Sequence, residues 1–265
     1  MLQRVLKTLE YDKIIQMLCE RANSSIGREL LSTLEPSSEF ESVRRQLDLT
    51  EEAESYYFKT GRSPVNAFSD MRECLRRMHA SLYINAAELL GVASCLRASR
   101  VVKEALYDPE SGGLLSGLAQ QLVVHRSIEE EIKRCILSED EIADAASPDL
   151  ARIRRGMAQA NERVRERLNA MIHSTTYQKY LQEPLVTIRG GRYVVPVKQE
   201  YRQNVPGFVH DQSGSGATLF IEPAAVVELG NEYRRLLAEE ADEIERILCE
   251  LTALDRKSTR LNSSH

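Results

Sequence analysis

The sequence has no apolar run that approaches the roughly 18 residues a membrane-spanning helix needs. Its first residues, MLQRVLKTLEY, follow an amphipathic pattern instead of the unbroken apolar stretch of a secretion signal. We therefore expect a cytoplasmic protein with no membrane partner. The 265 residues are 42% hydrophobic and 28% charged, which is enough for one or two domains with buried cores.

Two chemical motifs are also missing. No GxxxxGK string followed by Ser or Thr occurs, so the chain lacks a phosphate-binding loop and we expect no ATP site and no cofactor in it. The cysteines are far apart, form no CxxC pair and mostly occupy apolar positions of helical patterns. Buried reduced thiols are therefore favoured over a metal or disulfide role. These residues are Cys19, Cys74, Cys95, Cys135 and Cys249.

Amphipathic helices dominate the first half of the chain. Apolar residues recur at intervals of three and four up to about residue 137, and short polar breaks such as LEPSS and DPESGG separate the repeats. Three capping pairs, each with a carboxylate three residues after the capping side chain, mark helix starts: Ser38 with Glu41, Asn85 with Glu88, and Ser127 with Glu130. We expect six or seven helices packed as a helical core domain over residues 1–146.

A long helix is predicted from Ser147, because SPDL offers an N-cap followed by proline at the first helical position. Its apolar residues repeat at a spacing near 3.5, which is typical of a narrow coiled-coil seam. The same seam returns in residues 223–255. Residues 147–183 carry 7 basic and 4 acidic groups, whereas 223–255 carry 3 and 9. We expect these segments to be the two arms of an antiparallel coiled coil.

Between the arms, in residues 184–222, the apolar period drops to two. The strand-like runs LVTIR and RYVVPVK flank Gly190 and Gly191, which suit a hairpin turn because both can adopt positive φ. A second pair, GFVHDQ and ATLFIEP, flanks the flexible SGSG segment. The expected fold is mainly α, with a four-stranded β clamp at the tip of the coiled-coil lever. A hairpin that merely closes two helices is the alternative.

Five side chains of this β-rich insertion are candidates for binding nucleic acid. Arg189 and Arg192 flank the two-glycine turn, and Lys198, Tyr201 and Arg202 lie in the segment leading to the second hairpin. Such groups bind phosphates and stack on bases without requiring a particular base sequence. Four of these five side chains are basic. Ordinary solvation of the surface would also explain four basic residues, so the residues alone leave both interpretations open.

Two further clusters receive simpler interpretations. A stripe of arginines on the first arm is expected to pair with the acidic second arm; it consists of Arg152, Arg155, Arg163 and Arg167. The residue types of a hydrolytic triad occur at His210, Asp211, Ser213 and Ser215. Because neighbouring residues of a strand point to opposite faces, we expect no catalytic relay there.

The last residues, 256–265, read RKSTRLNSSH. They resemble a translated sequencing adapter and are excluded from the fold prediction.

The string YLQEPLVTIRGGRYVVPVKQEYRQNVPGFVHDQSGSGATLFIEPAAVVELGNEYRRL resembles the clamp and returning lever helix of the bacterial MutS-two family. The segments TLEYDKIIQML and ASPDLARIRRGM resemble the core of the same family, so the resemblance extends over residues 1–255. It implies a dimeric ATPase whose closure moves the levers and clamps. It also implies that ATP, Mg²⁺ and endonuclease residues belong to domains absent from this chain, which carries no catalytic residue of its own.

The resemblance implies binding to DNA or to ribosomal RNA, because family members are described as endonucleases that suppress homologous recombination and as factors that sense and split collided ribosomes. The first hypothesis is therefore a core, lever and clamp that grip nucleic acid or the ribosome without catalysis. The second is a structural coiled-coil spacer whose hairpin tip binds a protein partner. A hydrolase acting through His210 is the third, and we expect no turnover from it.

Overall fold

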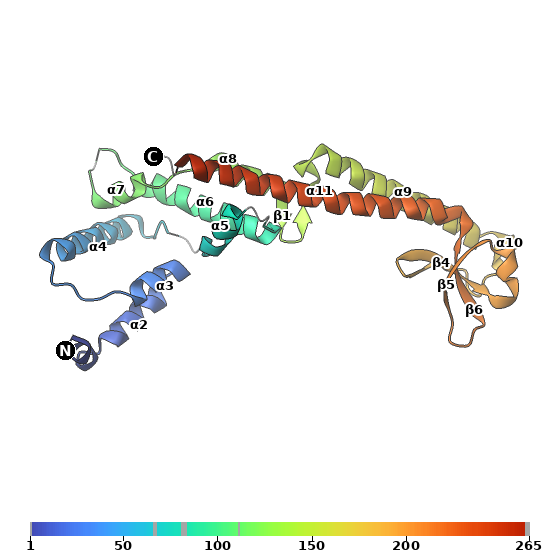
Figure 1. Cartoon of the computed structure of the whole chain (residues 1–265), viewed down its shortest axis with the longest axis horizontal. Coiled ribbons are helices and arrows are strands. Elements are labelled where there is room, and N and C mark those ends of the chain that lie inside the picture. Colours follow the sequence, from blue (N-terminus) through green and yellow to red (C-terminus); the bar gives the residue numbers. More distant parts are fainter. Residues whose placement is uncertain (1, 66–67, 81–83, 111, 263–265) are drawn as a thin grey trace. The chain divides into compact units, whose positions relative to one another are not determined.

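The computed structural model describes residues 2–65, 68–80, 84–110 and 112–262. It divides into two compact units, residues 1–143 with 248–265 and residues 144–247, and each is described here by itself. The chain is mainly helical with one small four-stranded antiparallel sheet, which confirms the expected fold class at this level (Figure 1). Among the described residues, no helix combines the length and the apolar character needed to cross a membrane.

Over its first segment, up to residue 143, the described part of the first unit contains eight helices, where the periodicity predicted six or seven, and the end of the last helix of the chain also belongs to this unit. The additional division occurs at Glu10, whose left-handed backbone (φ 53°) ends one helix and starts the next. A two-stranded ladder that the periodicity did not predict follows the eighth helix. The elements are α1 (Leu2–Thr8), α2 (Tyr11–Arg21), α3 (Ser25–Ser32), α4 (Phe40–Thr60), α5 (Arg72–His79), α6 (Ala86–Leu106), α7 (Leu114–Gln120), α8 (Arg126–Cys135), β1 (Ile136–Ser138) and β2 (Glu141–Ile142).

One of the three predicted capping pairs is confirmed. Asn85 accepts from the Glu88 N–H at 2.9 Å, and the Glu88 carboxylate accepts from the Asn85 N–H at 3.1 Å. The prediction at Ser38 is wrong because α4 begins after Glu39. The Glu39 N–H donates to the hydroxyl of Ser37. The prediction at Ser127 is also wrong, since α8 begins at Arg126, two residues earlier than a cap at Ser127 requires, and this serine lies inside the first turn.

The core of the first unit lies around α6, α8 and β1, where Ile84, Leu89, Ile132 and Ile136 are fully buried. The cysteines are reduced thiols, as expected, but only two of them are buried. Burial raises the pKa of the Cys135 thiol. Cys74 and Cys135 are the buried pair, Cys19 and Cys95 are half-buried, and Cys249 is exposed, so the expectation of general burial is wrong.

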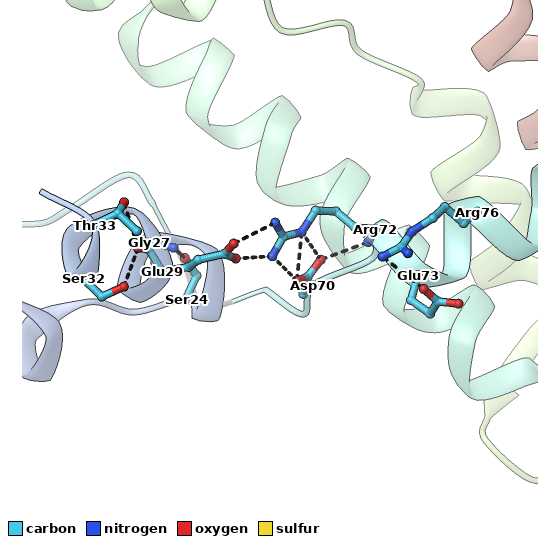
Figure 2. Close-up of polar contacts among 9 residues, drawn as sticks. All are labelled: Ser24, Gly27, Glu29, Ser32, Thr33, Asp70, Arg72, Glu73 and Arg76. Carbon is cyan, nitrogen blue, oxygen red and sulfur yellow. Dashed lines mark hydrogen bonds and ion pairs between the residues drawn. The ribbon is translucent and has the colours of Figure 1, made fainter.

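Polar contacts attach α3 to the segment before α5 (Figure 2). The Arg72 guanidinium donates from Nε to both Asp70 oxygens at 3.0 Å, and its terminal nitrogens bond the Glu29 carboxylate. Hydrogen bonds from Arg72 lower the pKa of Asp70 to about 2. Ser24 caps α3 by accepting from the Gly27 N–H at 3.0 Å. These contacts join α3 to the start of α5, although both partners of the Arg72–Glu29 pair are exposed and water screens it.

The second unit contains the β-rich insertion and the helices that flank it. As predicted, Ser147 caps α9 by accepting from the Leu150 N–H, with Pro148 at the first helical position. The last helix continues to residue 262, so it includes most of the tail that showed no periodicity. The elements are η1 (Asp144–Ala146), α9 (Pro148–Ile172), α10 (Thr175–Gln178), β3 (Thr187–Arg189), β4 (Arg192–Lys198), η2 (Gln199–Asn204), β5 (Gly207–Gln212), β6 (Thr218–Pro223) and α11 (Ala224–Asn262).

The four strands form an antiparallel sheet in the order β3-β4-β6-β5, as two hairpins joined through β4 and β6. Gly190 and Gly191 adopt φ values of 55° and 72° and leave Arg189 paired directly with Arg192. The predicted two-residue turn is therefore confirmed. A bulge between Val209 and Asp211 interrupts the pairing of β5 with β6. An irregularity of this kind discourages other chains from adding to the exposed edge.

Helices α9 and α11 lie side by side, and the sheet packs near the end of α9 where α11 begins (Figure 1). The Arg154 Nε donates to Glu240 at 2.6 Å, and Gly156 approaches the Leu236 side chain. A hydrogen bond from Arg246, with a second from the Ser147 hydroxyl, lowers the pKa of Glu243 to about 2. One apolar cluster joins the helices to the sheet through Val164, Leu168, Ile172, Val195, Val197, Ile221 and Val226, and so fixes the sheet on the helices.

Candidate nucleic-acid interface

Arg192, a predicted phosphate contact, is part of the internal framework of the second unit. Its side chain is 14% exposed, and it donates to Glu222 at 2.9 Å and to Asn231 of α11 at 2.7 Å. The Glu222 carboxylate, only 4% exposed, is also 2.7 Å from His210 Nε2. Such a buried charge is tolerated because it is paired and hydrogen-bonded. Arg192 therefore connects the sheet to α11 and is not a cation available to a ligand.

Arg189 is half-exposed and links the two hairpins. Its Nε lies 3.3 Å from the Asp211 carboxylate, and its guanidinium carbon lies 4.6 Å from the centre of the Phe220 ring. An exposed ion pair of this kind contributes little stability, since water screens it. The side chain therefore retains accessible surface for a ligand, although Asp211 reduces its net positive charge.

Of the remaining three candidates, Lys198 lies at the far end of β4 from Arg192, about 20 Å away at 3.3 Å per residue, and Tyr201 is next to it. Lys198 ends β4, and its Nζ donates to the Lys179 carbonyl at 3.4 Å and lies 6.0 Å from the centre of the Tyr201 ring. Arg202 donates to the carbonyl oxygens of Val205 and Gly207 at 3.2 and 2.9 Å, closing the turn before β5. The five predicted residues are therefore not gathered at one end of the sheet.

The structure adds three residues that the prediction missed, all from the segment after α9. The Tyr180 ring lies 5.2 Å from that of Tyr201 with a 40° tilt, and 6.2 Å from that of Tyr177 in an edge-to-face contact. Sequence reasoning assigned this segment to the lever arm, which ended at residue 183, although the string YQKY was a visible signal of aromatic and basic character. We name the set Tyr177, Lys179, Tyr180, Lys198 and Tyr201 the tyrosine–lysine cluster.

The tyrosine–lysine cluster combines the two kinds of group that hold single-stranded nucleic acid. Lys179 is exposed, and the other members are half-buried at the edge of the apolar cluster. Ammonium groups attract phosphates, and aromatic rings of this kind accept stacked bases or sugars. The ring contacts among the tyrosines fix their orientation before any ligand arrives, which reduces the entropy lost on binding.

The four residues with triad chemistry do not form a relay. His210 bonds Glu222, whereas Asp211 pairs with Arg189, so the imidazole and this carboxylate have different partners. The Ser213 hydroxyl lies 3.4 Å from that of Ser215 and accepts from the Thr218 N–H at 3.0 Å, which stabilises the turn between β5 and β6. Over the described ranges, no group of three or more His, Cys, Asp or Glu side chains could hold a metal ion.

The expected pairing of the α9 arginine stripe with α11 is found only in part: no stripe residue forms an ion pair with α11 among the described residues, although two of them face its acidic side chains. Arg152 pairs with Asp149 of its own helix, and Arg155 donates to the Ala151 carbonyl. Arg154, outside the predicted stripe, makes the contact with α11 instead. The two remaining stripe residues line a groove of about 750 Å³ between the helices: Arg163 and Arg167 on α9, with Glu228 and Glu232 on α11.

Comparison with known proteins gives one consistent set of relatives. The chain is 44% identical over 255 residues to Endonuclease MutS2 of Alkaliphilus oremlandii, 45% over 254 residues to that of Acetivibrio thermocellus, and 46% over 252 residues to that of Pelotomaculum thermopropionicum. These matches cover 94% to 95% of this chain but only 32% of each relative. The chain therefore spans about a third of the length of the relatives it matches. No family model matches it.

Proposed function

We propose that this chain, homologous over nearly its whole length to about a third of the MutS2 endonucleases, is the nucleic-acid-gripping part of such a protein. In this proposal residues 147–183 and 223–255 form a coiled-coil lever, and residues 184–222 form its clamp. The observation that carries the proposal is the tyrosine–lysine cluster, in which the Lys198 ammonium and the oriented rings of Tyr180 and Tyr201 meet at one end of the sheet, beside the exposed residue Lys179. The contact needs no catalytic residue.

The partner in this proposal is DNA or the RNA of a ribosome, since phosphate contacts do not distinguish the two polymers. In the full-length protein the lever would transmit ATP-driven closure of a homodimer to the clamp, with ATP and Mg²⁺ bound outside this chain. Suppression of homologous recombination and the splitting of collided ribosomes are the cellular roles that follow. The resemblance of the clamp string supports this part of the proposal.

A spacer whose tip binds a protein is the second candidate. It is favoured by two apolar side chains of the sheet, Ile188 and Phe208, which are exposed. A protein partner would bury such residues, whereas a nucleic acid would contact the cationic end first. The experiment below separates the two candidates, because a protein-binding spacer would not respond to removal of two ammonium groups.

Replacing Lys179 and Lys198 together with alanine should weaken binding of a labelled 20-nucleotide single strand about tenfold, equivalent to about 1.4 kcal/mol. Fluorescence anisotropy on DNA, RNA and duplex probes measures this. Neither ammonium group supports an ion pair in the described structure, and Lys198 makes only a 3.4 Å bond to a carbonyl, so the fold should survive.

The matched control is Arg44→Ala with Arg45→Ala, which removes the same charge from exposed positions of α4 in the first unit. Its affinity should stay within twofold of the unmodified chain. Equal affinities for the lysine variant and the unmodified chain on every probe would refute the proposal. Replacing Arg192 is unsuitable for this purpose, because it disrupts a buried ion pair and would weaken binding through unfolding.

A further inference from the structure

A cavity of about 170 Å³ lies where the β3–β4 hairpin meets α9 and α11. Its lining includes two aromatic side chains, Tyr193 and Tyr233, and two buried valines, Val164 and Val226. Ile188, which is 55% exposed, also lines it, so the cavity communicates with solvent. An engineered apolar cavity of about 150 Å³ in another protein holds one benzene ring. This cavity therefore has room for a single six-membered ring.

Three of the lining side chains carry a hydrogen-bond donor that has no acceptor among the described residues. Arg192 Nε is buried and unpaired, although a terminal nitrogen of the same guanidinium donates to Glu222 at 2.9 Å. The Asn161 oxygen accepts from the Tyr193 hydroxyl at 2.7 Å, and the amide nitrogen of Asn161 is left without a partner. The hydroxyl of Tyr233 is the third such donor. Polar groups inside a protein are nearly always satisfied, so these donors indicate a ligand or water.

The charge of the cavity favours a neutral ligand. Among the described residues that line it, only Arg192 and Glu222 are charged, and they form an ion pair with each other. The second Glu222 oxygen is 2.7 Å from His210 Nε2, so both carboxylate oxygens already have partners. A phosphate would be repelled by this carboxylate, and the repulsion is stronger where water is excluded. Unpaired donors beside a neutralised ion pair suit a neutral molecule that carries acceptor oxygens.

We propose that this cavity binds one neutral pyrimidine ring of the uracil or thymine type. Such a ring has two carbonyl oxygens that accept from the unpaired donors of Arg192, Asn161 and Tyr233. Its N–H group donates to the Asn161 oxygen, which has a second lone pair. Its flat faces suit the tyrosine rings, because bases stack on aromatic side chains. The two fused rings of a purine need more space than a cavity that holds one ring.

A pyrimidine ring reaches the cavity from one of two sources, a free nucleoside or an unpaired base of a bound strand. The second source rests on the proposed function. A strand that also contacts the tyrosine–lysine cluster would run along β4, because Lys198 lies about 20 Å from Arg192 at 3.3 Å per residue. That distance corresponds to about six nucleotides at the 3.4 Å rise of a stacked strand.

Equilibrium dialysis of the 265-residue chain with radiolabelled uridine tests the cavity itself. We expect saturable binding that thymidine displaces and that adenosine displaces at least tenfold less well. Asn161→Asp should weaken uridine binding at least tenfold. The new carboxylate still accepts from the Tyr193 hydroxyl, but it replaces the amide donor by an acceptor and adds a negative charge. Tyr233→Phe, which removes one donor and keeps the ring, should weaken binding about fivefold.

Asn169→Asp is the matched control, because it makes the same change at an exposed position of α9 outside the cavity. It should bind uridine within twofold of the unmodified chain. Absence of saturable uridine binding would overturn the proposal, as would equal displacement by adenosine or equal losses in the two aspartate variants. Circular dichroism shows whether each variant folds. Should Asn161→Asp not fold, unchanged uridine affinity in Tyr233→Phe would overturn the proposal.

The second part of the experiment identifies the source of the ring. Fluorescence anisotropy compares a labelled 20-nucleotide oligothymidine with an abasic strand of the same length. Relative to Asn169→Asp, we expect Asn161→Asp to lower the affinity for oligothymidine at least threefold and to leave that for the abasic strand within twofold. Equal oligothymidine affinities of the two variants would assign the cavity to free nucleosides. Failure of both strands to bind the unmodified chain would contradict the proposed function, whereas the uridine result would still decide for or against the cavity.

Discussion

Gly207→Ala should lower the free energy of unfolding of the second unit by about 3 kcal/mol, at the upper end of the range for overpacking. A Cβ at this position would lie 2.0 Å from the Glu222 carbonyl oxygen and 2.9 Å from its carbonyl carbon. Both are backbone atoms of the paired strand β6, so no side-chain rotation relieves the clash. The β5–β6 pairing must separate locally, and the Arg202 bond to the Gly207 carbonyl would be strained with it.

Gly214→Ala is the matched control for this prediction. No heavy atom lies within 4 Å of a Cβ placed there, and the residue is not in the positive-φ region, so the change should be within about 0.5 kcal/mol of neutral. Urea unfolding measures both variants, and tyrosine fluorescence serves as the signal because the chain has no tryptophan. Equal stability of the two variants would show that β5 does not pair with β6 as described.

Glu222→Ala should cost about 3 to 5 kcal/mol, because it leaves the buried Arg192 without its carboxylate partner. The Arg192 side chain is 14% exposed and its Nε has no hydrogen-bond partner in the structure. Glu222→Gln should cost less, since an amide oxygen still accepts from Arg192, although it does not balance the guanidinium charge.

Asp211→Ala is the comparison for Glu222→Ala. It removes the carboxylate that pairs with Arg189, the other arginine of this sheet in an ion pair. The Asp211–Arg189 pair is exposed at 49% and 42%, so its loss should change stability by less than about 1 kcal/mol. Combining Glu222→Leu with Arg192→Leu should recover much of the loss, because both buried charges are removed together. A double variant as unstable as Glu222→Ala alone would show that the ion pair is not the cause.

Local chemistry explains which parts of the fold the sequence predicts. Ser147 before a proline and Asn85 before Glu88 specify helix starts through their own hydrogen bonds, and both were confirmed. Two adjacent glycines specify the β3–β4 turn, because only positive φ closes it in two residues. Ser38 and Ser127 failed because the N-caps of α4 and α8 are Glu39 and His125, one and two residues away, without a side-chain capping bond, and local pattern does not resolve such small shifts.

The candidate site was less predictable, because its residues meet through tertiary packing. Nothing local to Arg192 indicates that Glu222 and Asn231, 30 and 39 residues away, would bury it. Tyr180 joins Tyr201 only because the chain after α9 folds back beside the end of β4. Charge indicated the insertion as the candidate region, but only burial distinguishes which of its cations remain available to a ligand.

The most direct test of the account is to locate the nucleic acid on the chain by ultraviolet crosslinking. The unmodified chain is irradiated with a labelled single strand, and crosslinked peptides are identified by mass spectrometry. Crosslinks should concentrate at Tyr177, Tyr180 and Tyr201, and should fall at least fivefold when Lys179 and Lys198 are both alanine. Crosslinks confined to the first unit or to α9, with none in residues 177–202, would contradict the assignment of the clamp as the gripping surface.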